Sequence, residues 1–132
     1  MGRRILVVDD DRDIAEAMTD VLAEGGYDVQ RACDGLEALD LLRRAAELPE
    51  LIVLDLRMPR LDGGEFRERQ LGDPRIGRIP VVLVSADGGA RERSRAMRVA
   101  EYLPKPLGPD DLLRAVARVL GMAAAAPATL PG

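Results

Sequence analysis

Leu51-Ile52-Val53-Leu54-Asp55 is the strongest strand signal in the chain, because four apolar residues stand together and a carboxylate follows them. The runs from Ile5 to Val8 and from Val81 to Val84 have the same character. A strand with water on one face alternates apolar and polar residues, whereas a strand covered on both faces is apolar throughout. The three runs therefore predict central strands of a sheet that helices cover on both faces.

Stretches of helical character separate these strands. The helices are expected at residues 13–25, 36–46, 64–71, 90–98 and 112–120. Two shorter strands are expected at residues 28–32 and 101–103. This alternation predicts an α/β fold with a doubly wound, five-stranded parallel sheet in the order 2-1-3-4-5 and helices on both faces.

The length of 132 residues is that of one domain with a single core. That domain is expected to comprise residues 1–121. Ala123 to Ala126, followed by Pro127 and Pro131, are typical of a segment without a packed face. Residues 122–132 are therefore expected to be a flexible Ala/Pro tail or the stub of a linker.

Charge and composition exclude several classes of partner. The net charge of −4 argues against a nucleic-acid-binding surface, which is normally basic. The aromatic residues Tyr27, Phe66 and Tyr102 are too few to form a base-stacking platform. No apolar run approaches the roughly 20 residues needed to cross a bilayer. We therefore expect no nucleic acid and no membrane as partners, and a cytoplasmic location.

Histidine and cysteine usage limits the chemistry further. The chain has no histidine and one cysteine, Cys33. A histidine-based catalytic triad and a zinc site built from histidine and cysteine are thus excluded. Cys33 cannot form an internal disulfide and is expected to be a small buried residue.

Polar residues follow the predicted strands at the points where the strands end. Asp9 and Asp10 follow the first strand, Asp55 the third, Ser85 the fourth and Lys105 the fifth. Ligands of open parallel sheets bind beyond the carboxyl ends of the strands. Since neighbouring strands lie about 4.8 Å apart, we expect the three carboxylates to share one pocket, with Ser85 and Lys105 on its far side.

Such a pocket needs positive charge, because carboxylates that lie close together raise each other's pKa. Lys105, the one lysine beside eighteen arginines, supplies a compact ammonium. Oxygen ligands without histidine or cysteine favour Mg²⁺. A metal, a hydroxyl and an ammonium facing a carboxylate suit a phosphoryl group, whose phosphorus the carboxylate can attack.

The sequence resembles the receiver domain of bacterial two-component response regulators, of the chemotaxis-regulator type, over about Arg3 to Leu120. The matching segments occur in the family's order and at nearly its spacing. They are Ile5 to Asp10, Leu54 to Pro59 with Asp62-Gly63, Val84 to Ala86 and Tyr102 to Pro106. The resemblance implies a flavodoxin-like fold and a role in phosphorelay signal transduction, as a phosphoacceptor switch rather than a turnover enzyme.

The resemblance also implies how the site is assembled. Asp55 would accept a phosphoryl group from a sensor histidine kinase or a phosphotransfer protein. Mg²⁺ would be held by Asp9, Asp10 and Asp55 together with the backbone carbonyl of Arg57.

Further roles concern the phosphoryl group and the readout. Ser85 and Lys105 would bind phosphoryl oxygens, and Ser85 would act with Tyr102 as the conformational switch. The face of the fourth helix, fifth strand and fifth helix would bind a downstream protein or a second copy of the chain. We also expect Arg57 and Asp87, each two residues after a site residue, to line the pocket mouth and tune the access of water.

The sequence departs from the commonest family pattern around the fourth helix. Serine replaces the more frequent threonine at position 85, and the stretch from Ser85 to Lys105 is about two residues shorter than usual. Val99-Ala100-Glu101 stands where a Gly-Ala pair normally precedes the fifth strand. The fourth helix is therefore expected to be short, shifted or loose.

A haloacid-dehalogenase-like phosphatase is the alternative function. It would use Asp9 and Asp11 after the first strand, with Asp110-Asp111 as a late acidic pair. That scheme leaves Asp55 unexplained, and Asp11, Asp110 and Asp111 are better placed to cap helices. A receiver-like module that binds partners without phosphorylation is a third possibility, and a flavin-binding flavodoxin is poorly supported.

Overall fold

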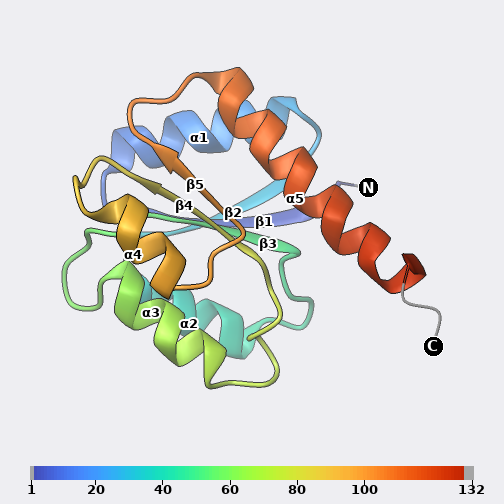
Figure 1. Ribbon diagram of the computed structural model, residues 1–132, viewed down its shortest axis with the longest axis horizontal. Coiled ribbons are helices and arrows are strands. Elements are labelled where there is room, and N and C mark those ends of the chain that lie inside the picture. The colour runs from blue at the N-terminus through green and yellow to red at the C-terminus, as the bar shows by residue number, and fades with distance from the viewer. Residues whose placement is uncertain (1, 130–132) are drawn as a thin grey trace.

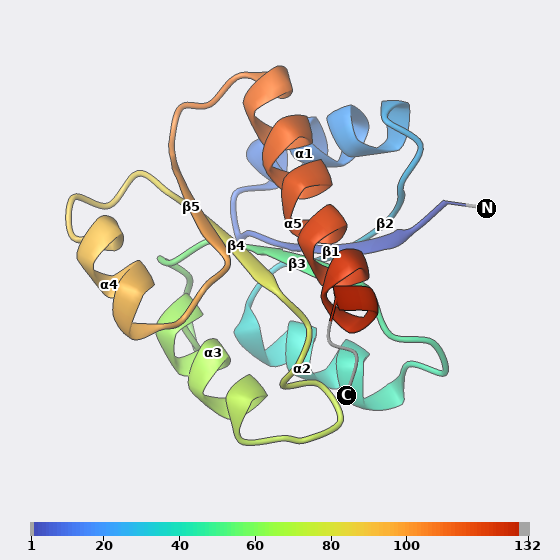
Figure 2. The ribbon, with the colours of Figure 1, turned by 45° about the vertical axis from the view of Figure 1, so that its right-hand side comes forward.

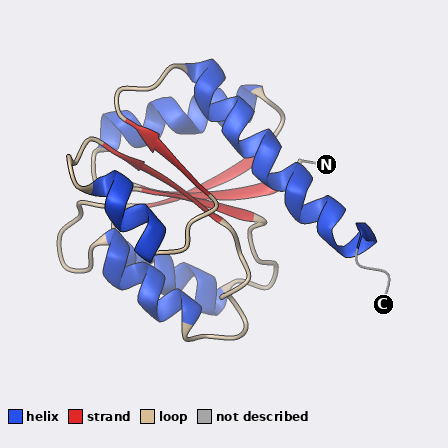
Figure 3. Cartoon of the chain, in the orientation of Figure 1, coloured by secondary structure: helices blue, strands red, loops and turns tan. Residues whose placement is uncertain are grey.

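The computed structural model describes the backbone from Gly2 to Thr129 and the side chains as far as Gly121. Five strands and five helices alternate along the chain (Figures 1 and 3). The strands are β1 (Arg4–Val8), β2 (Asp28–Ala32), β3 (Leu51–Leu54), β4 (Val81–Ser85) and β5 (Glu101–Pro104). The helices are α1 (Arg12–Glu24), α2 (Gly35–Arg44), α3 (Gly63–Leu71), α4 (Ala90–Ala96) and α5 (Pro109–Thr129).

The strands form one parallel sheet in the order β2-β1-β3-β4-β5, as predicted. The register pairs Val8 with Leu54, and Leu54 with Leu83. At the far edge Ser85 pairs with Pro104. Since the last residues of neighbouring strands lie side by side, the residues that follow them share one edge of the sheet.

Helices cover the sheet on both faces (Figures 1 and 2). Alternate residues of a strand point to opposite faces. Leu6 and Leu54 therefore pack toward α2, α3 and α4, while Val7 and Val53 pack toward α1 and α5. This two-sided burial explains why β1, β3 and β4 are apolar throughout.

Aspartates cap the first three helices. Asp11 is the N-cap of α1 and accepts hydrogen bonds from the backbone N–H groups of Asp13 and Ile14. Asp34 caps α2 in the same way, and Asp62 forms a reciprocal capping box with Glu65 at the start of α3. A cap of this kind contributes about 0.5–2 kcal/mol.

The C-terminal helix and Cys33 differ from the expectations. Helix α5 continues to Thr129 rather than ending near residue 120. Residues 123–126 are all alanine, which has the highest helix propensity of the amino acids. Residues 130–132 of the expected tail lie outside the described residues. Cys33 is exposed rather than buried, since it follows β2, the edge strand of the sheet. None of the helices within residues 2–129 has the length and hydropathy to cross a bilayer.

Candidate functional site

Asp9, Asp10 and Asp55 come together at the carboxyl edge of the sheet, as predicted. One carboxylate oxygen from each lies within 4.8 Å of the others. The backbone N–H of Asp55 donates to Val8 O (2.9 Å) and that of Asp9 to Ala32 O (3.2 Å). The strand ladder thus continues one residue past β1 and β3, which fixes both aspartates. Asp9 and Asp55 are buried and Asp10 is exposed.

Lys105 reaches into this cluster from the other side of β4. Its Nζ donates to Asp9 Oδ2 at 2.9 Å and lies 3.4 Å from Asp55 Oδ1. The backbone N–H of Lys105 donates to Ser85 O at 2.9 Å, so the β4–β5 ladder sets where the side chain begins. The side chain of Lys105 is only 12% exposed, so its ammonium interacts with the two buried carboxylates more than with solvent.

Burial and like charge raise the pKa of Asp55 to about 6, and the nearby Lys105 opposes the shift only in part. Burial lowers the pKa of Lys105, but the hydrogen bond to Asp9 and the charge of Asp55 leave it above its usual value. Two buried carboxylates and an exposed one beside a single ammonium carry excess negative charge. An oxygen-only donor set of this kind fits Mg²⁺.

Ser85 ends β4, the strand between Asp55 and Lys105, and is buried. Its Oγ accepts a hydrogen bond from the backbone N–H of Asp87 at 3.1 Å. Arg57 Nη2 lies 3.0 Å from Asp87 Oδ1. This pair joins the β3–α3 loop to the β4–α4 loop. That the two residues line the mouth of the pocket stays a prediction.

Tyr102 lies on β5, half-buried against the core under α2, α3 and α4. The guanidinium of Arg91 on α4 lies 5.4 Å from the centre of its ring. A cation over an aromatic face is attracted by the electrons of the ring. Tyr102 therefore joins β5 to α4 in this conformation.

Gly63 and Arg60 contribute to the site in ways that the sequence did not reveal. A Cβ on Gly63 would lie 2.5 Å from Asp55 O, and the Gly63 N–H donates to Leu56 O at 2.8 Å. Arg60 has a positive φ of 67° and its Nη2 lies 2.5 Å from Asp34 Oδ2 at the start of α2. The loop that carries Asp55 is thus folded tightly back on itself and held to α2. Met58-Pro59 and Asp62-Gly63 were the visible signals for this loop.

An apolar groove of about 550 Å³ begins beside Lys105 and runs along α1 and the start of α5. Ile14, Ala17 and Val21 line it on α1, and Pro106 and Leu107 line it on the β5–α5 loop. The acidic cluster therefore adjoins an apolar surface large enough for side chains of another molecule.

The chain matches the model of the response regulator receiver domain over residues 5–117. It is 41% identical over 117 residues to response regulator MprA of Mycobacterium bovis, with 86% of this chain and 48% of that protein covered. The chain thus spans about half the length of the curated relatives it matches.

Solved structures agree with this match. The signal receiver domain of a histidine kinase from Syntrophus aciditrophicus has a TM-score of 0.82 and 30% identity, covering 91% of each chain. The receiver domain of sensor histidine kinase PA1611 from Pseudomonas aeruginosa has a TM-score of 0.83 and 28% identity, covering 92% of this chain and 99% of its own. That structure holds a magnesium ion in its active site cleft.

The parallel α/β fold, the acidic cluster at its carboxyl edge and the match to receiver domains together identify a signalling receiver domain. The chain belongs to the receiver domain family of two-component response regulators.

Proposed function

We propose that Asp55 accepts a phosphoryl group from the phosphohistidine of a sensor histidine kinase or phosphotransfer protein. The observation that carries this proposal is the position of Asp55, which is buried at the carboxyl edge of the sheet with Asp9 and Lys105 beside it. A carboxylate oxygen of Asp55 forms the new P–O bond while the N–P bond of the donor breaks. The electron pair of that bond stays on the imidazole nitrogen.

The other residues of the pocket hold the transferred group. Asp9, Asp10 and Asp55, with the backbone carbonyl of Arg57, are the proposed ligands of Mg²⁺. When bound, Mg²⁺ neutralises phosphoryl oxygens in such sites. Lys105 is already within 3.4 Å of Asp55 and is assigned to a phosphoryl oxygen.

The remaining roles concern Ser85 and the pocket mouth. Ser85 leaves the sheet between Asp55 and Lys105, and its hydroxyl is assigned to another phosphoryl oxygen. The ion pair of Arg57 and Asp87 crosses from one loop to the other, and we propose that it slows the approach of water to the phosphoryl group.

The phosphatase alternative is disfavoured by how Asp9 and Asp11 are used. Asp9 Oδ2 accepts from Lys105, and Asp9 Oδ1 accepts from the Asp11 N–H at 2.9 Å. The Asp11 side chain caps α1, and Asp110 and Asp111 lie in the first turn of α5. The pocket therefore offers no second carboxylate at Asp11 to act as a general acid beside Asp9.

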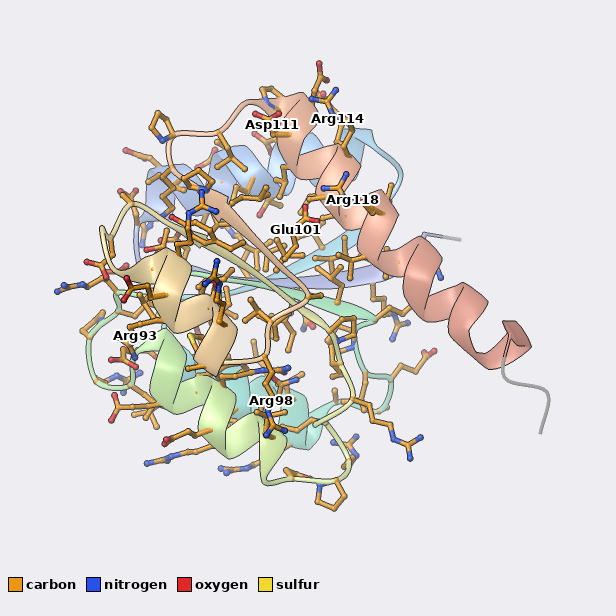
Figure 4. All side chains as sticks on the ribbon, viewed as in Figure 1. Arg93, Arg98, Glu101, Asp111, Arg114 and Arg118 are labelled. Carbon is orange, nitrogen blue, oxygen red and sulfur yellow. The ribbon has the colours of Figure 1, made fainter. Side chains whose placement is uncertain are left out.

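We propose that the face of α4, β5 and α5 carries the readout to a downstream protein or a second copy of the chain. Charged side chains gather there (Figure 4). Arg118 pairs with Glu101, and Arg114 with Asp111 at 3.1 Å.

A phosphoryl group at Asp55 adds negative charge that Ser85 and Lys105 bind better in one conformation than in another. Such a difference in affinity is what shifts the population of conformations, and the switch through Ser85 and Tyr102 is part of this proposal.

The groove along α1 is the proposed contact surface for the donor protein. A donor histidine must come within bonding distance of Asp55, and the groove is the apolar surface that begins at Lys105. Ala17→Glu places a charge in the groove, and Asp20→Ala changes an exposed residue of the same helix. The first variant should lose transfer from a phosphohistidine protein but keep transfer from acetyl phosphate. Equal loss with both donors would contradict this assignment.

Incubation with Mg²⁺ and acetyl phosphate tests the central proposal. The intact protein should gain the mass of one phosphoryl group, and Asp55→Asn should not. A phosphatase using Asp9 would instead lose its adduct in Asp9→Asn and keep it in Asp55→Asn. Residues 1–121 as the folding unit and a cytoplasmic location remain predictions.

A further inference from the structure

Helix α3 buries a positive charge that has no acidic partner. Arg67 is 6% exposed, and no ion pair includes it among the residues whose side chains are described. Burial lowers its pKa, and Arg98 lowers it further. Burying a charge costs free energy unless several hydrogen bonds compensate. A buried arginine without an acidic partner is therefore expected to have a role other than packing.

Each of the three guanidinium nitrogens of Arg67 donates a hydrogen bond to a neutral acceptor. Nε donates to Met97 O (3.0 Å) and Nη2 to Arg98 O (2.8 Å), both at the end of α4. Nη1 donates to the side chain of Gln70 (2.7 Å), whose amide donates in turn to Ile76 O and Ile79 O (2.9 Å each). One buried polar network thus joins α3, the end of α4 and the loop before β4.

The end of α4 needs this support. The helix has only seven residues, and its N-cap Gly89 makes no side-chain cap. At the other end, Arg98 N–H donates to Arg95 O and Val99 N–H to Ser94 O, which is the Schellman pattern. The residue in its left-handed position is normally glycine, but here it is Arg98 with φ 56°. Helix α4 is therefore short, and its C-terminal cap is strained.

Helix α3 also touches the loop of the phosphoacceptor. Its first residue, Gly63, packs against the Asp55 carbonyl. A Cβ on Gly64 would lie 2.3 Å from Arg93 Nη2 of α4. Figure 4 shows Arg93 near the start of α3 and Arg98 near the other end of α4. Helix α3 therefore contacts the Asp55 loop at its start and holds the C-terminal end of α4 through Arg67.

We propose that Arg67 is a positioning residue that fixes the C-terminal end of α4 and its junction with β5, and so couples the Asp55 loop to the α4-β5-α5 face. The coupling rests on the proposed phosphorylation of Asp55, whereas the anchoring of α4 does not. Two apolar residues in place of Arg67 and Gln70 would fill the same space without fixing the carbonyls of Met97 and Arg98.

Hydrogen exchange of Arg67→Met/Gln70→Leu against wild type and the exposed-site control Arg69→Met tests the anchoring. The amides of Met97, Arg98 and Val99 should exchange about ten-fold faster or more in the double variant, with β3 amides unchanged. Arg67→Lys keeps the charge but lacks the planar fork. The exchange rates of the same amides in this variant should therefore lie between those of wild type and those of the double variant. Wild-type exchange at these amides in the double variant, or equal acceleration throughout the sheet, would overturn the proposal.

The same measurement after phosphorylation tests the coupling. Phosphorylated wild type should change its exchange at Met97, Arg98 and Val99, and the double variant should lose about half of that change or more. A full change in the double variant, or none in phosphorylated wild type, would overturn the coupling. Mass spectrometry reports phosphorylation separately, so a protein that accepts no phosphoryl group contradicts the proposed function and leaves the anchoring test intact.

Discussion

The ammonium of Lys105 lies 3.4 Å from a carboxylate oxygen of Asp55, although β4 separates the strands that the two residues follow. The lysine is also 2.9 Å from Asp9, which makes Asp9 its closer partner. One cation therefore balances two buried anions. A transferred phosphoryl group would arrive within reach of a positive charge that is already held in place.

Removing that charge should affect both stability and chemistry. Lys105→Met leaves the fully buried carboxylate of Asp9 without its partner. We expect a loss of about 1–3 kcal/mol in the free energy of unfolding at pH 7.5, measured by urea denaturation. The rate of phosphorylation by acetyl phosphate should fall about ten-fold or more, because the positioned cation is lost. A variant with the wild-type rate would contradict the role of Lys105.

The acidity of Asp55 predicts a pH dependence in metal-free buffer. The pKa of Asp55 is raised from 3.8 to about 6 in the folded protein. Between about pH 3.8 and about 6, the carboxyl of Asp55 therefore holds a proton in the folded state that it has lost in the unfolded state. This contribution to stability is complete below about pH 3.8 and is lost as the pH rises through about 6.

Asp55→Asn removes this pH dependence, because asparagine stays neutral. The variant should match wild type near pH 4 and be more stable above pH 7, by on the order of 1–3 kcal/mol. Urea denaturation across this range measures the difference. A constant difference at all pH values would show that the buried charge of Asp55 is not its cause.

Metal binding should stabilise the folded protein. Mg²⁺ at about ten times its dissociation constant adds about 1.4 kcal/mol, so the melting temperature should rise by a few degrees relative to protein in chelator. Asp10→Asn removes an exposed ligand of the proposed site, and the rise should be lost or need far more Mg²⁺. Asp20→Asn, which changes an exposed carboxylate on α1 outside the cluster, should keep the rise. Loss in both variants would point to general charge screening.

Gly63 and Gly72, the first residue of α3 and its C-cap, offer a matched pair of substitutions. Alanine at Gly63 would bring Cβ within 2.5 Å of Asp55 O, so the loop must move. We expect a loss of about 1–3 kcal/mol and slower phosphorylation. At Gly72 the nearest atom is 3.6 Å away and φ is −79°, so alanine should be neutral or stabilise by up to about 1 kcal/mol. Denaturation and phosphorylation rates of the two variants check this, and equal behaviour would contradict it.

The sequence predicted the sheet and the cluster because both depend on local patterns. Continuous apolar runs mark strands that are buried on both faces, and parallel strands place the residues after them at one edge. The proximity of Asp9, Asp10 and Asp55 could therefore be predicted from the sequence. The capping role of Asp11 followed from its position before a helical pattern.

Other features depend on contacts between distant segments. Arginine is seldom buried, so nothing in the chain indicated that Arg67 lies in the core beside Met97 and Arg98. The contact of Arg60 with Asp34 requires a left-handed residue that no local signal encodes. The closer pairing of Lys105 with Asp9 than with Asp55 depends on side-chain placement, which strand order does not specify.

Locating the phosphoryl group tests the central claim most directly. Borohydride converts an aspartyl phosphate to homoserine, and sequencing of the peptides by mass spectrometry identifies the modified position. After treatment with Mg²⁺ and acetyl phosphate, we expect homoserine at Asp55 alone. Homoserine at Asp9, or at no position in protein that was exposed to donor and metal, would contradict the account.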